Sequence, residues 1–128
     1  MKFWSKALLI MLSSFAILPV HADEPWPNHP MKFVVGFGPG GANDLVARVV
    51  AEGVSKQLNQ TVIVENKPGA GSTLGADIVA KSAPDGYTFF VSAGGIITNP
   101  MIKSSMPYKE GDLVPVGSLT ISPSIIVV

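Results

Sequence analysis

The sequence has no cysteine, only two histidines and a single long hydrophobic run, and each scarcity excludes a class of chemistry. Without cysteine there is no disulfide framework, no thiol nucleophile and no cysteine metal site. His21 and His29 both lie near the N-terminus, so no histidine is placed to act as the base of a serine hydrolase. The nine cations balance the nine anions, so the charge provides no general attraction to nucleic acid.

The one long hydrophobic run lies at the N-terminus and predicts an export signal. Lys2 and Lys6 precede the apolar segment 7–20, which is shorter than the roughly 20 residues of a membrane-spanning helix. We expect cleavage after Ala22, so that residues 1–22 are a signal peptide and the mature protein is periplasmic. Loss of the two lysines would leave seven cations against nine acids, a net charge of about −2, and we expect no binding to nucleic acid or to a membrane surface.

The rest of the chain predicts an α/β fold. Strands are expected at 31–37, 61–65 and 87–92, and helices at about 43–59 and 72–82. Strands that alternate with helices indicate a parallel sheet with helices on both faces. The proline-rich segment 23–30 is an expected extended leader, 93–100 an expected loop and 107–117 an expected irregular segment. The final run 124–128 is apolar and has nothing after it, so we expect a fragment.

Capping and hydrophobic spacing predict details of the two helices. Asn43 is the expected N-cap of the first helix, and Ser72 or Thr73 the expected N-cap of the second. The apolar residues expected to face inward are Val46, Val50, Val54 and Leu58, with Leu45 and Val49 beside them, and on the second helix Leu74, Ile78 and Val79.

A glycine-rich loop after the first expected strand is the main candidate site. Residues 36–41 match the G-x-G-x-x-G spacing of dinucleotide-binding proteins, and Glu65 ends the next strand. Pro39, however, removes a backbone donor where a pyrophosphate would need one, and Asp44 adds a negative charge. Glycines followed by a helix N-terminus suit any anion, and Asp44 suits a ligand with a hydroxyl, an amine or a bridging water beside its carboxylate. A tight structural turn and the dinucleotide domain of an incomplete oxidoreductase remain as alternatives.

Three expected loops share one edge of the predicted sheet, where α/β proteins bind their ligands. They are residues 36–44, 66–73 and 92–100. In the third loop, Ser92, Thr98 and Asn99 offer hydroxyl and amide donors to carboxylate oxygens, although ordinary turn chemistry explains them equally well. Asp44, Asp77 and Asp85 lack the spacing of a catalytic pair or a metal site. We therefore expect a binding protein without cofactor or metal, and no enzyme.

Several motifs in order resemble one family. They are P-G-G-x-x-D at 39–44, V-E-N-K-P-G-A-G at 64–71, A-P-D-G-Y-T at 83–88, N-P at 99–100, P-Y at 107–108 and D-L-V-P-V at 112–116. Together they span essentially the whole mature chain. The chain resembles the tripartite tricarboxylate transporter receptors, also called Bug-type extracytoplasmic solute receptors.

The resemblance implies a monomeric periplasmic binding protein of two α/β lobes, a Venus flytrap that closes on a small carboxylate. The ligand would be a dicarboxylate, tricarboxylate, amino acid or aromatic acid, delivered to a membrane permease. The family's first-loop contacts carry over to Phe37, Pro39, Gly40, Gly41 and Asp44. Such receptors are about twice this length or more, so residues 31–117 would be a partial first lobe and 118–128 the start of a crossover to a missing second lobe. A truncated remnant without transport function is a further alternative.

Overall fold

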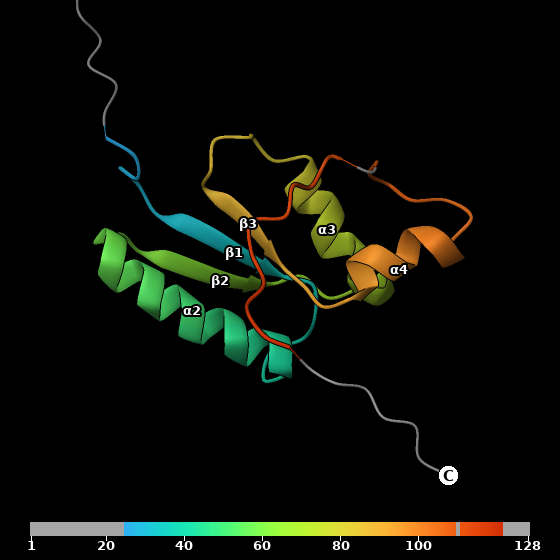
Figure 1. Cartoon of the computed structure of the whole chain (residues 1–128), viewed down its shortest axis with the longest axis horizontal. Helices are drawn as coiled ribbons and strands as arrows, with labels where there is room; N and C mark the ends of the chain where they lie inside the picture. Colours follow the sequence, from blue (N-terminus) through green and yellow to red (C-terminus); the bar gives the residue numbers. More distant parts are fainter. Residues whose placement is uncertain (1–24, 110, 122–128) are drawn as a thin grey trace, which may run out of the picture.

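The computed structural model describes residues 25–109 and 111–121 (Figure 1). Its elements are β1 (Met31–Val35), α2 (Ala42–Leu58), β2 (Val62–Asn66), the short 3₁₀ helix η1 (Ala70–Ser72), α3 (Thr73–Ala80), β3 (Thr88–Val91) and α4 (Gly95–Ile102). The predicted signal peptide at 1–22 and the apolar run at 124–128 lie outside the described residues. Within the described ranges, no helix is long and apolar enough to cross a membrane.

Three parallel strands form the sheet in the order β2-β1-β3. Met31 of β1 pairs with Val62 of β2, and Lys32 of β1 pairs with Thr88 of β3. The central strand is apolar along most of its length, as expected of a parallel strand that is covered on both faces. The predicted α/β fold with a parallel sheet and flanking helices is confirmed.

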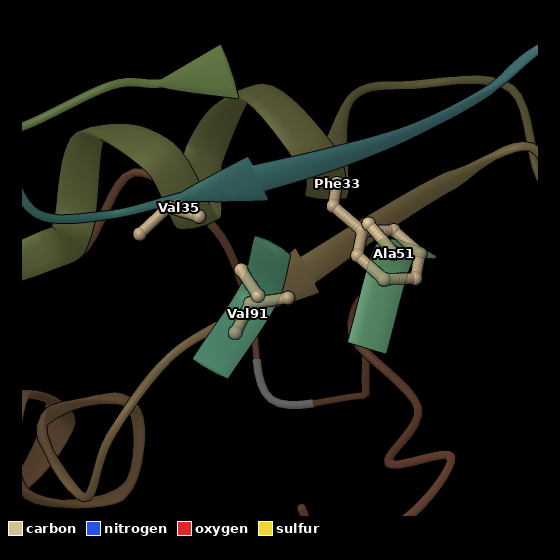
Figure 2. Packing of buried hydrophobic residues seen from close by; sticks show 5 residues of the cluster. Phe33, Val35, Ala51 and Val91 are labelled. Atoms are coloured by element: carbon tan, nitrogen blue, oxygen red, sulfur yellow. The ribbon is translucent and has the colours of Figure 1, made fainter. Parts of the chain in front are cut away.

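Helices α2 and α3 cover opposite faces of this sheet. Phe33, Val35 and Val91 pack with Ala47 and Ala51 of α2 in the main hydrophobic core (Figure 2). Side chains alternate along a strand, so Val34 and Phe90 point to the other face. There α3 lies so close that a Cβ on Gly75 would be 3.0 Å from the Phe90 ring. Figure 1 accordingly shows α2 on one side of the sheet and α3 on the other.

The inward face of α2 differs from the predicted stripe. The residues that are buried on this helix are Asp44, Ala47 and Ala51, and the valines Val46, Val50 and Val54 are half-buried. Leu45, Val49 and Leu58, in contrast, are exposed, so that part of the prediction is wrong. The small alanine side chains allow the helix backbone to approach the strands closely, which rotates the larger residues toward the edges of the interface.

The predicted helix caps are also partly corrected. Gly41 occupies the N-cap position of α2, and Asn43 is the second residue of the helix, so it is not the cap. The predicted end is confirmed, because Asn59 takes a left-handed conformation directly after Leu58. Ser72 does occupy the N-cap position of α3, but its hydroxyl makes no capping hydrogen bond.

The second half of the chain holds two further corrections. On α3, Val79 is buried as predicted, but Leu74 and Ile78 are exposed. The predicted loop at 93–100 is wrong, because most of it belongs to α4, which even contains Pro100. Two glycines, a threonine and a proline give this segment poor helix propensity, and contacts with the loop before α3 overcome that preference.

The predicted leader packs on the turn before β3, at the end of the sheet away from the loops after the strands. Residues 25–30 form no helix or strand. His29 stacks on Tyr87 at a ring separation of 3.5 Å, and Trp26 lies 6.0 Å from the same ring. The backbone N–H of Asn28 donates to the Tyr87 hydroxyl over 2.9 Å. The described residues of 107–117 are irregular, as expected, and 118–121 form no helix or strand.

Candidate functional site

The loops that follow the three strands come together at one edge of the sheet. All strands are parallel, so their carboxyl ends share this edge, which we call the rim. Asn66, at the end of β2, donates through Nδ2 to the Phe37 carbonyl in the loop after β1 over 3.0 Å. Asn99, on α4, donates to the Gly71 carbonyl in the loop after β2 over 2.7 Å. Side chains therefore tie each loop to its neighbour.

The glycine loop at 36–41 leads into α2 without a side-chain cap. Gly40 has a φ of +81°, a conformation that favours glycine. Gly41 has no side chain that could cap the first N–H groups of the helix, and no other side chain supplies the cap. Because a helix of 17 residues carries partial positive charge at its N-terminus, these N–H groups attract an anion. Pro39, Gly40 and Gly41 are all exposed, so the loop is accessible from solvent.

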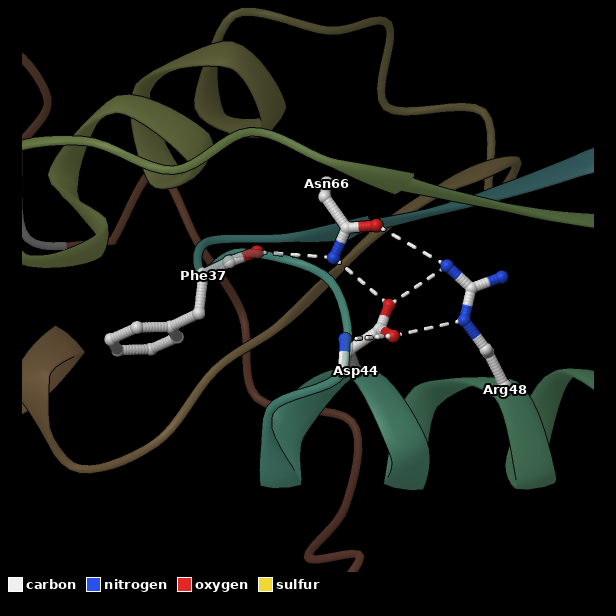
Figure 3. A network of polar contacts seen from close by, with 5 residues as sticks. Phe37, Asp44, Arg48 and Asn66 are labelled. Carbon is white, nitrogen blue, oxygen red and sulfur yellow. Dashed lines mark hydrogen bonds and ion pairs between the residues drawn. The ribbon is translucent and has the colours of Figure 1, made fainter.

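Asp44 sits directly behind this loop and is almost completely buried, with 2% of its surface exposed. Its Oδ2 accepts hydrogen bonds from the Gly40 N–H over 2.9 Å and from Arg48 Nε over 3.0 Å. Its Oδ1 accepts from Asn66 Nδ2 over 2.9 Å and pairs with Arg48 Nη2 over 3.0 Å (Figure 3). The Arg48 guanidinium, followed by the Gly40 N–H and the Asn66 amide, holds the pKa of Asp44 far below its usual range.

The network of Asp44, Arg48 and Asn66 binds the glycine loop through two hydrogen bonds. Asp44 binds the Gly40 N–H, and Asn66 binds the Phe37 carbonyl, while Arg48 also donates to Asn66 Oδ1 over 3.3 Å. The negative charge of Asp44 is therefore compensated within the protein. A direct contact between Asp44 and a ligand stays a prediction, and such a contact would have to compete with these protein donors.

The loop after β2 contains three consecutive left-handed residues. Ala70, Gly71 and Ser72 have φ values of 48°, 64° and 75°. This conformation brings the buried Ser72 hydroxyl to 3.3 Å from the Ser92 hydroxyl, at the end of β3. It also brings Ser72 against the glycine loop, where a Cβ on Gly36 would lie 2.0 Å from Ser72 Oγ. The two serines thus lie where the three loops meet.

The three donors predicted in the third region have different surroundings. Ser92 meets the second loop through Ser72, as described above. Asn99 is buried, and its Nδ2 donates to Gly71 O and, over 3.3 Å, to Thr73 Oγ1. Thr98 is exposed, and its hydroxyl donates to the Gly94 carbonyl of the same helix over 3.3 Å.

Arg48 and Lys103 were missed by the sequence analysis. Asn66 and Ser72 were placed in the expected loop 66–73 but were not selected as site residues. For Arg48 a signal existed, because an acid and a base four residues apart on a helix form an ion pair. For Lys103 there was none: it directly follows a helix that local sequence does not predict, and its ammonium donates to Ala70 O over 2.5 Å and to Thr73 Oγ1 over 2.6 Å.

Three other acids, Glu65, Asp77 and Asp85, are engaged locally. Glu65 pairs with Lys32 over 3.2 Å and with Lys67 over 3.5 Å, and Lys32 chiefly lowers its pKa. Asp77 pairs with Lys81, and Asp85 accepts the Tyr87 N–H. In the part of the chain that the structure describes, no three potential metal ligands of the His, Cys, Asp and Glu type lie together.

A hollow in the described part of the structure lies outside the three rim loops, although Arg48 of the Asp44 network borders it. That hollow, of about 430 Å³, runs between α2 and β2. It is lined by residues 48, 51, 52, 55, 56, 61, 62 and 64, none of which belongs to the rim loops.

Comparison with known proteins gives consistent matches. A family model described as "Tripartite tricarboxylate transporter family receptor" matches residues 46–128. A UPF0065 protein of Bordetella pertussis is 37% identical over 121 residues, which cover 94% of this chain and 36% of the relative. The chain therefore spans about a third of the length of the curated relatives it matches.

Solved structures agree with the sequence matches. The periplasmic binding protein BugD is 42% identical, with a TM-score of 0.63 over 66% of this chain and 28% of BugD. An R. palustris protein with adipate is 35% identical, with the same TM-score and the same coverage of both chains.

Proposed function

The chain belongs to the tripartite tricarboxylate transporter receptor family, and on this premise we propose that it is part of a periplasmic receptor for a small carboxylate. The ligand would be a dicarboxylate, a tricarboxylate, an amino acid or an aromatic acid, and the receptor would deliver it to the membrane permease of a tripartite transporter. It would act as a monomer and catalyse no reaction.

The start of α2 is the observation that carries this proposal. Its first N–H groups are not capped by any side chain, they follow an exposed glycine loop, and they lie at the carboxyl end of a parallel sheet. A carboxylate placed there would accept hydrogen bonds from main-chain N–H groups and would meet the positive end of the helix dipole. The buried Asp44 fixes the loop from behind, and its charge is compensated by Arg48.

Other parts of the rim would complete one side of the cleft. We propose direct contacts of the ligand at Phe37, Pro39 and Gly41, and at Gly40 through atoms other than its N–H, which is donated to Asp44. Water-mediated contacts are proposed at the exposed Thr98 and near Ser92. The buried Asn99 and Asp44 would act mainly by holding the loops in place. Residues 31–117 would form part of the first lobe, which a second lobe would close against by hinge motion.

The relatives narrow the ligand class. One neighbour of known structure, 35% identical to this chain, has adipate. A ligand with two carboxylates could place one at the α2 N-terminus and the other toward the opposite lobe. We therefore favour a dicarboxylate, with amino acids and aromatic acids as the next classes to test.

The dinucleotide alternative has little support in the structure. Glu65, which would have to hold a ribose, is paired with Lys32 and Lys67. Gly40, which would offer an N–H to a pyrophosphate, donates that N–H to Asp44 instead. The other alternative, a remnant that shares the fold and does not bind, is decided by the same binding experiment.

The test is calorimetric and thermal-shift titration of the complete gene product that contains these residues. Adipate, succinate, citrate, aspartate, glutamate, benzoate and NAD would be compared. A ligand at 100 times its Kd should stabilise the folded state by about 2.7 kcal/mol. Stabilisation by NAD alone would support the dinucleotide alternative, and no stabilisation by any of the acids would contradict the receptor proposal.

A further inference from the structure

The left-handed segment Ala70–Ser72 holds two of the three non-glycine residues with positive φ in the described backbone. Residues other than glycine rarely adopt positive φ, yet Ala70 and Ser72 both do, on either side of Gly71. A Cβ in this region meets the neighbouring backbone, so the segment persists only if its surroundings impose it. Strain of this kind gathers at ligand-binding sites, and here it lies at the rim.

Two side chains hold the segment, one from Asn99 on α4 and one from Lys103, which directly follows α4. Lys103 donates from Nζ to the Ala70 carbonyl over 2.5 Å, and Asn99 donates from Nδ2 to the Gly71 carbonyl over 2.7 Å. Both also donate to Thr73 Oγ1, at the first residue of α3. Two successive carbonyls of the strained segment are thus turned toward α4, and each has a side-chain donor there.

The segment in turn positions the glycine loop. Its left-handed conformation directs the Ser72 hydroxyl into the space under Gly36, next to Ser92. A Cβ on Gly36 would lie within 2.0 Å of that hydroxyl, so the loop after β1 rests directly on Ser72. A shift of Ser72 would therefore move the glycine loop or leave it without support.

We infer that Lys103 and Asn99 are positioning residues for the carboxylate site: they hold Ala70–Ser72 in its left-handed conformation, and Ser72 then sets the glycine loop. This inference rests on the proposed function, because the loop it positions is the proposed carboxylate cradle. Neither side chain needs to touch the ligand. The effect on affinity arises because fewer molecules have the binding-competent loop once the donors are lost.

Lys103→Met and Asn99→Ala test the inference in the complete gene product. The matched controls are Lys56→Met, which removes an exposed lysine from the far end of α2, and Met101→Ala, which shortens an exposed side chain two residues from Asn99 on α4. Calorimetry would measure Kd for the carboxylate that binds the wild-type protein, and NMR would measure the amide shifts of Gly69 and Gly71.

Lys103→Met and Asn99→Ala should each weaken binding by about tenfold. This is the effect expected if only about a tenth of the molecules keep the glycine loop in its binding-competent conformation. The Gly71 amide signal should shift or split in both. The controls should do neither. Lys103→Arg keeps a cationic donor and should restore most of the affinity, and Ala70→Gly added to Lys103→Met should recover part of it, since glycine adopts the left-handed conformation without strain.

Three results would overturn the inference. The first is wild-type affinity together with an unchanged Gly71 signal in Lys103→Met and Asn99→Ala. The second is a loss of unfolding free energy with no change in Kd, which would make the pair merely structural. The third is a wild-type protein that binds none of the acids, which refutes the proposed function itself and is recognised before any variant is made. If Lys103→Met does not fold, Asn99→Ala decides the question alone.

Discussion

Replacing Gly36 with alanine probes the closest packing at the rim. The new Cβ would lie 2.0 Å from Ser72 Oγ, 2.8 Å from Ser72 Cβ and 3.1 Å from Phe90 Cζ. Gly36 has no positive φ, so its backbone conformation accepts alanine and the contacts alone decide the cost. Rotation of the serine hydroxyl cannot relieve the contact, because Ser72 Cβ is also too close.

Overpacking of a single methyl group costs about 1–3 kcal/mol. We expect Gly36→Ala to lower the free energy of unfolding by about 3 kcal/mol, the upper end of this range. Neither neighbour can move away easily, because Ser72 lies in a strained backbone segment and Phe90 is packed on the sheet. The measurement is urea denaturation of the complete gene product, followed by circular dichroism, with the free energy of unfolding taken by linear extrapolation.

Two further variants make this result decisive. Gly38→Ala, in the same loop, would have no atom within 4 Å of its new Cβ and should change stability by no more than about 0.5 kcal/mol. Adding Ser72→Gly to Gly36→Ala removes the clashing side chain at a position whose φ suits glycine, so it should recover more than about 1 kcal/mol. Equal costs for Gly36→Ala and Gly38→Ala, or strict additivity in the double variant, would refute the packing argument.

Three other predictions concern the network, its ionisation and the core. Asn66→Ala removes donors to the glycine loop and should weaken carboxylate binding by about tenfold, equivalent to about 1.4 kcal/mol, by calorimetry. The pKa of Asp44 is lowered on folding, chiefly by Arg48, so its stabilising effect is present above its unfolded pKa of about 3.9 and is lost as pH falls below that value. Urea midpoints should therefore fall less steeply below about pH 4 in Asp44→Asn than in wild type, and equal slopes would contradict this. Phe33→Ala should cost about 3–5 kcal/mol, whereas Val49→Ala, at an exposed site, should cost less than about 0.5 kcal/mol by the same denaturation assay.

Much of the fold could be predicted because its signals are local. The run Met31–Val35 is apolar enough to indicate a strand that is buried on both faces, and the glycines after it indicate a turn. Asn59 tolerates the left-handed conformation that ends α2, so that end was also predictable. Alternation of strands and helices then implies a parallel sheet and places three loops at one edge.

The errors arose where packing overrides local pattern. A stripe of valines and leucines predicts the buried face of α2, but the helix lies close to the sheet through Ala47 and Ala51 and leaves Leu45 and Val49 exposed. Poor helix propensity predicts a loop at 93–100. Asn99 and Lys103, however, donate hydrogen bonds to carbonyls of the loop before α3, and most of residues 93–100 form the helix α4. Both the buried face of α2 and the formation of α4 depend on contacts between residues that are far apart in the sequence.

The sequence by itself determined the α/β class, the order of strands and helices, the glycine loop and the motifs that indicate the receptor family, because each is encoded within a short stretch of chain. The tertiary structure alone decided what surrounds that loop. Asp44 accepts a hydrogen bond from Asn66, 22 residues away. Ser72 lies against Gly36, and Asn99 of α4 donates to the carbonyl of the neighbouring Gly71. Hydrogen bonds between residues so distant in sequence depend on how the helices and strands pack, and no local pattern specifies them.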